Sequence, residues 1–83
     1  MRKVFVDVLA RHDAQGQTTP LLVVWEDGRK FEIGRVLDIR PAASRKVGGA
    51  GIRYLVRIGR HETVLFEEEG RWFVEGKDAP ERE

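Results

Sequence analysis

The residues of this chain that could do chemistry lie mainly in one basic segment, residues 34–61, which holds seven basic residues and one acid. Within it, Arg45 and Lys46 precede a glycine-rich stretch that contains Gly48 and Gly49. Backbone N–H groups of such a stretch can converge on an anion, so this loop is a candidate phosphate site with two adjacent cations. It lacks the Gly-Lys-Ser/Thr ending of a nucleotidase phosphate loop, and the alternative is an ordinary connection.

Four arginines of the same segment extend this candidate site. Arg53 and Arg57 share the parity of one strand, so their side chains project from one sheet face, and Arg35 and Arg40 belong to the preceding strand. We predict that these cations and the loop bind nucleic acid or another phosphate-bearing partner. The full set is Arg35, Arg40, Arg45, Lys46, Gly48, Gly49, Arg53 and Arg57.

The rival hypothesis is neutralisation within the chain. The formal net charge is only +1, because residues 62–83 contain eight acids and three bases. In this alternative Glu67, Glu68, Glu69 and Glu75 balance the arginines and leave no positive face.

Catalytic residue types are scarce. The chain has two histidines, His12 and His61, one serine, Ser44, and no cysteine. No nucleophile, base and orienting group occur together, so we predict that the protein is not an enzyme and that it uses no metal or cofactor.

Composition also bears on domain organisation and location. We expect one domain over residues 1–75 and a flexible tail over residues 76–83. The absence of cysteine favours a reducing cytoplasm, and no apolar run is long enough to predict a membrane span or secretion signal.

Two acid-glycine pairs predict tight hairpin turns between apolar runs. Asp27-Gly28, interpreted as a two-residue turn, places Val24 opposite Phe31 and directs Trp25 outward. Glu69-Gly70 places Phe66 opposite Phe73.

The remaining strands follow from alternation of apolar and polar residues. A long strand is expected over residues 29–40, bent at Gly34 so that it pairs with two neighbours and ended by Pro41. Residues 41–51 are expected to connect it to a strand beginning at Ile52. A turn near Arg60 and His61 then sets Val56 opposite Leu65 and Arg53 opposite Glu68.

These elements predict an all-β domain, a small antiparallel barrel of about five to six strands built from hairpins, SH3-like or OB-like. A two-layer sandwich is the alternative closure. The predicted core comprises Val24, Phe31, Ile33, Tyr54, Val56, Leu65 and Val74.

A second class of function, protein-protein interaction or assembly as a homodimer without a nucleic-acid role, is indicated by apolar residues of the opposite parity. They are Leu55, Val64, Phe66 and Phe73, which form an apolar patch unless another part of the chain covers them.

The turn and core residues also resemble those of small bacterial β-domains of unknown function. The pattern is Trp25-x-x-Gly28-Arg29-x-Phe31-x-Ile33-x-x-Val36-Leu37, followed by Tyr54-x-Val56, Leu65 and Trp72-x-Val74. Some similar domains are appended to proteins related to error-prone DNA polymerases, and the resemblance therefore implies a partner of the nucleic-acid class. It carries no binding residue over to this chain, because its residues mark the fold.

Overall fold

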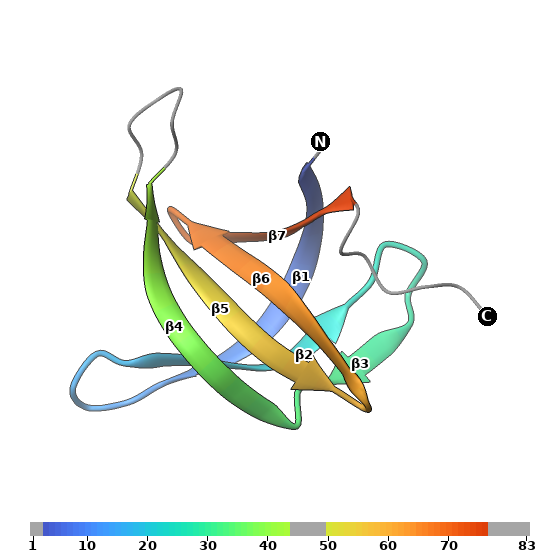
Figure 1. The fold of residues 1–83 in the computed structure, drawn as a ribbon, viewed down its shortest axis with the longest axis horizontal. Coiled ribbons are helices and arrows are strands. Elements are labelled where there is room, and N and C mark those ends of the chain that lie inside the picture. Colours follow the sequence, from blue (N-terminus) through green and yellow to red (C-terminus); the bar gives the residue numbers. More distant parts are fainter. Residues whose placement is uncertain (1–2, 44–49, 77–83) are drawn as a thin grey trace.

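The computed structural model describes residues 3–43 and 50–76, and within these the chain forms one antiparallel sheet of seven strands that curls into a half-barrel (Figure 1). The order across the sheet is β3-β2-β1-β7-β6-β5-β4. The strands are β1 (Lys3–His12), β2 (Thr18–Val24), β3 (Lys30–Glu32), β4 (Arg35–Ala43), β5 (Ala50–Ile58), β6 (His61–Glu68) and β7 (Arg71–Glu75). The predicted all-β class is confirmed. No helix within the described ranges has the length and apolar character needed to cross a membrane.

The bend predicted at Gly34 explains how the sheet curls. The strand expected over residues 29–40 is divided there into β3, which pairs with β2, and β4, which pairs with β5. At the division the Ile33 N–H donates to the Leu21 carbonyl and the Gly34 N–H donates to the Arg57 carbonyl, both at 2.9 Å. One stretch of chain therefore joins the two edges of the sheet, and the division accounts for seven strands where five to six were predicted.

Strand β1 also pairs with two neighbours, each along a different part of its length. Residues 3–6 pair with β7, and residues 7–12 pair with β2. Lys3 thus lies opposite Glu75, and the first and last strands are neighbours in the sheet.

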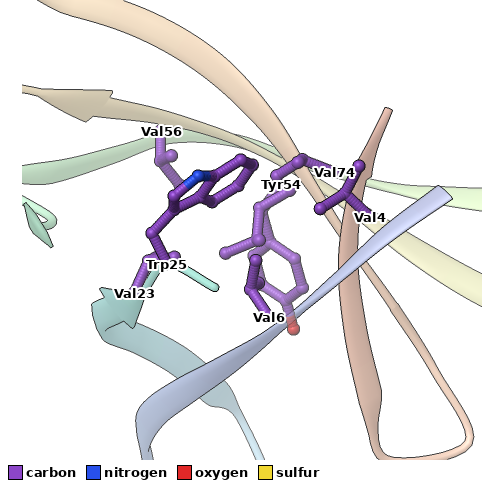
Figure 2. Close-up of a cluster of buried hydrophobic side chains, with 8 residues drawn as sticks. Val4, Val6, Val23, Trp25, Tyr54, Val56 and Val74 are labelled. Atoms are coloured by element: carbon purple, nitrogen blue, oxygen red, sulfur yellow. The ribbon is translucent and has the colours of Figure 1, made fainter. Parts of the chain in front are cut away.

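The core occupies the concave side of the sheet, as Figure 2 shows for its valines and two of its aromatic residues. Tyr54, Val56 and Leu65 are almost fully buried, and Tyr54 packs on Trp72 with ring centroids 5.3 Å apart. The buried cluster is Val4, Val6, Val23, Trp25, Tyr54, Val56, Leu65 and Val74. The predicted core positions Tyr54, Val56, Leu65 and Val74 are confirmed, and Phe31 and Ile33 pack against the cluster while half-buried.

The prediction for the first hairpin was wrong by one residue. The Gly28 N–H donates to the Trp25 carbonyl at 2.8 Å, and the Trp25 N–H donates to the Arg29 carbonyl at 2.7 Å. The loop therefore has three residues, with Gly28 at positive φ in the bulge position. Val23, rather than Val24, lies opposite Phe31. Because a shift of one residue exchanges the two faces of a strand, Trp25 and Val23 enter the core and Val24 does not.

Two further boundaries differ from the prediction. Pro41 does not end its strand, because β4 lies at the edge of the sheet, where a residue without an N–H is tolerated. The turn after β5 lies at Gly59 and Arg60, which places Tyr54 opposite Leu65 and Arg53 opposite Phe66. This register differs by two residues from the prediction, so the faces of β5 are unchanged.

Candidate nucleic-acid interface

Four predicted site residues, Arg35, Arg40, Arg53 and Arg57, gather on the β4-β5 hairpin. Arg35 lies directly opposite Arg57, and Arg40 lies directly opposite Arg53. Arg53 and Arg57 alternate with the buried residues of β5, so their side chains point away from the core. All four arginines therefore occupy the outer face of the hairpin.

A bulge explains how Arg35 and Arg40 share that face. The two residues are five positions apart, and in a regular strand an odd separation sends side chains to opposite faces. The register of β4 against β5 shifts between Val36 and Asp38, which adds one residue to β4. The bulge thereby brings both arginines to the same side of the sheet.

Acidic side chains balance only part of this charge. The Arg40 Nε lies 2.6 Å from Asp38 Oδ2, and the Arg57 Nη2 lies 3.1 Å from Glu62 Oε2. Both pairs are exposed to solvent, and such pairs contribute about 0–1 kcal/mol. Within the described residues Arg35 and Arg53 form no ion pair.

The glutamates of the rival hypothesis contact other groups. Glu68 pairs with Lys3 at 3.4 Å and lies opposite Gly51 and Arg71, not opposite Arg53 as predicted. The Glu67 carboxylate accepts a hydrogen bond from the Gly70 N–H at 2.8 Å. In the described residues, the partners of the β4-β5 arginines are therefore Asp38 and Glu62.

The other predicted site residues, Arg45, Lys46, Gly48 and Gly49, lie outside the described residues. The ends of the connection that contains them are held together, because Ala43 pairs with Ala50. The Ala43–Ala50 pair lies at the same end of the β4-β5 ladder as the Arg40–Arg53 pair.

A row of aromatic side chains continues from Arg53 across the outer face. Arg53 lies opposite Phe66, Phe66 opposite Phe73, and Phe73 opposite Phe5. The Phe66 and Phe73 rings stack with centroids 5.1 Å apart, and Phe5 meets Phe73 edge-on at 5.6 Å. The row of Arg40, Arg53, Phe66, Phe73 and Phe5 thus crosses five adjacent strands.

Two cations lie over these rings. The Lys3 Nζ is 4.7 Å from the centroid of Phe73, and the Arg71 guanidinium carbon is 3.9 Å from that of Phe5. Such contacts are attractive because the ring face carries negative electrostatic potential. Phe73 is buried and Phe66 half-buried, whereas Phe5 is 43% exposed.

The apolar patch predicted at Leu55, Val64, Phe66 and Phe73 is thus largely covered within one chain. Leu55 lies opposite Val64, and both are half-buried. Sequence reasoning missed Phe5 as part of this face, because its place depends on pairing between the first and last strands. Trp25, predicted to face outward, lies in the core.

An open hollow of about 460 Å³ lies at the Phe5 end of the row. It is lined by residues 5–8 of β1, by Gly70 of the β6-β7 turn, and by Arg71 and Trp72 at the start of β7. Arg71 supplies a positive charge to this lining and Asp7 a negative one.

The histidines are solvent-exposed on strand ends. The His12 Nδ1 lies 2.9 Å from the Thr18 hydroxyl, and His61 begins β6. Over residues 3–43 and 50–76, no group of three or more His, Cys, Asp or Glu side chains is arranged to hold a metal ion.

No family model, curated protein or solved structure matches this chain.

Proposed function

We propose that this protein is a nucleic-acid-binding module, and that the outer face of the β4-β5 hairpin contacts the phosphate backbone. The observation that carries this proposal is the placement of Arg35 opposite Arg57 and of Arg40 opposite Arg53. Like charges directly opposite each other in a ladder destabilise a sheet. A phosphate lying between two guanidinium groups converts that repulsion into two charge-assisted hydrogen-bonded contacts.

The location of the hairpin supports the same role. In the sequence, Arg45 and Lys46 fall between the end of β4 at Ala43 and the start of β5 at Ala50, and we propose that they add to the cations of the arginine face. We infer a small SH3-like or OB-like barrel as the scaffold; folds of the second kind bind oligonucleotides on an exposed strand face. The role is binding rather than catalysis, and we place it in the cytoplasm.

Charge reversal at the two arginines without ion pairs tests the proposal. Fluorescence anisotropy of labelled oligonucleotides is measured with wild type, with Arg35→Glu/Arg53→Glu, and with a matched control, Arg11→Glu/Lys30→Glu. The control makes the same change in net charge on β1 and β3. We expect the β4-β5 variant to lose binding and the control to retain most of it. If both variants lose the same amount of oligonucleotide affinity, the loss reflects net charge alone. That result would overturn the proposal that the outer face of the β4-β5 hairpin is the binding face.

Salt dependence provides a second measure. With about four phosphate contacts, affinity should fall roughly 50- to 150-fold between about 50 and 200 mM salt, because bound counterions are released from the nucleic acid. The Arg45→Glu/Lys46→Glu variant, measured over the same salt range, then shows how much of the affinity the connection between β4 and β5 contributes. An absence of binding even at low salt contradicts the proposal.

A further inference from the structure

We infer, resting on the proposed function, that the partner is single-stranded nucleic acid and that at least one unpaired base stacks at Phe5. The arginine face by itself does not distinguish single strands from duplexes, because both carry phosphates. The phenylalanines of the row on the same face do distinguish single strands from duplexes. Bases are available to aromatic side chains when they are unpaired and splayed out of a helix.

The row has the dimensions and order of a single-strand track. Neighbouring strands lie about 4.8 Å apart, so the four spacings from Arg40 on β4 to Phe5 on β1 span roughly 19 Å. Arg40 and Arg53 occupy one end of this track, and the phenylalanine rings occupy the other, with Lys3 and Arg71 over two of them. A strand that crosses it places phosphates at Arg40 and Arg53 and a base at Phe5.

Phe5 is the ring best placed to receive that base. Phe5 is 43% exposed, whereas Phe73, directly opposite it on β7, is buried and contacts it edge-on at 5.6 Å. The Arg71 guanidinium lies 3.9 Å from the Phe5 ring. The guanidinium therefore covers one face of the Phe5 ring. Guanidinium planes stack on bases as aromatic rings do, so the platform is Arg71 supported by Phe5, together with the remaining exposed part of the Phe5 ring.

The hollow beside this platform fits a base better than a phosphate. Phe5 and Arg71 belong to its lining, and Asp7 contributes a carboxylate. A carboxylate repels phosphate but accepts hydrogen bonds from the exocyclic amino group of cytosine. The base is therefore expected in the hollow, while the phosphates remain on the β4-β5 arginines.

The test compares three probes of one length by fluorescence anisotropy at low salt: a single-stranded oligonucleotide, its duplex, and an abasic strand that keeps the phosphates but lacks bases. The variant is Phe5→Leu, which keeps an apolar side chain against Phe73 but removes the aromatic face. Phe5→Tyr, which restores a ring, is the matched control. Thermal unfolding of each variant checks that the fold is retained.

We expect wild type to prefer the single strand over the other two probes. Phe5→Leu should weaken single-strand binding by roughly 5- to 150-fold, the range for loss of one stacked base. It should leave abasic-strand binding unchanged, and Phe5→Tyr should restore the preference. Equal binding of all three probes, unaffected by Phe5→Leu, overturns the single-strand inference and leaves the proposed function standing. Failure to bind any probe overturns the proposed function itself.

Discussion

Arg35 and Arg57 lie directly opposite each other on the outer face of the β4-β5 ladder, and only Arg57 has an acidic partner within the described residues, Glu62. Arg35→Glu replaces this like-charge pair by an attractive one. Without nucleic acid we expect the free energy of unfolding to rise by roughly 0.2–1 kcal/mol, measured by urea denaturation at low salt. The gain should shrink at high salt, where surface charges are screened. A lower stability for Arg35→Glu than for Arg35→Gln would contradict a repulsion between Arg35 and Arg57.

Gly51 occupies a position where β5 has no room for a side chain. A Cβ there would lie 2.8 Å from the Glu68 Cγ and 3.0 Å from the Ala42 carbonyl oxygen, which belongs to the backbone. We expect Gly51→Ala to destabilise the protein by about 1–3 kcal/mol through overpacking. Gly34→Ala is the matched control, because a Cβ at Gly34 meets its nearest atom at an ordinary 3.7 Å. Equal urea midpoints for the two variants would show that the strands move apart at no cost.

Glu69 has φ of 51°, in the left-handed region, and it precedes Gly70 in the β6-β7 turn. Asparagine tolerates this conformation better than glutamate, and Asn-Gly is the preferred pair for a two-residue turn with both residues at positive φ. Glu69→Asn should therefore raise the free energy of unfolding by about 1 kcal/mol. Glu26→Asn, in the other acid-glycine turn, serves as the control, since Glu26 does not have positive φ. A gain of the same size at both positions would exclude backbone conformation as its cause.

Burial raises the pKa of the Tyr54 phenol above its ordinary value of 10.0, and the nearby charge of Glu67 raises it further. Folding therefore favours the neutral phenol. This contribution to stability is fully present below the unfolded pKa of 10.0 and is lost as pH rises toward and through the folded pKa. Tyr54→Phe should reduce the loss of stability above pH 10.0, as measured by urea denaturation across this range.

Absorbance of the phenolate provides a direct check, because Tyr54 is the single tyrosine of the chain. The folded protein should titrate at higher pH than the same protein in urea. Coincident titration curves in the two conditions contradict the burial argument.

The two acid-glycine turns show how far sequence reasoning could reach. Glu69-Gly70 is a two-residue turn, and the predicted pairing of Phe66 with Phe73 is confirmed. Asp27-Gly28 has the same local chemistry, yet it belongs to a three-residue loop in which the Asp27 carboxylate accepts a hydrogen bond from the Arg29 N–H at 3.0 Å. An acid-glycine pair suits both loop lengths, so the choice depends on burial of Trp25, a tertiary effect.

The candidate site could likewise be predicted from the sequence only in part. The common face of Arg53 and Arg57 followed from strand alternation alone. The addition of Arg35 and Arg40 to that face depends on the bulge between Val36 and Asp38, which leaves no signal in residue type. The place of Phe5 depends on pairing of β1 with β7, between residues about seventy positions apart, for which local periodicity carries no information.

The interior position of β1 in the sheet, between β2 and β7, has a consequence for synthesis of the chain. Strand β1 can pair with β2 as soon as both leave the ribosome, but its pairing with β7 must wait until nearly the whole described chain has been made. During that interval the β1 edge that will face β7 exposes unpaired backbone groups, and Val4 and Val6 lack Val74. The nascent chain is therefore most vulnerable to strand-edge aggregation before translation reaches β7.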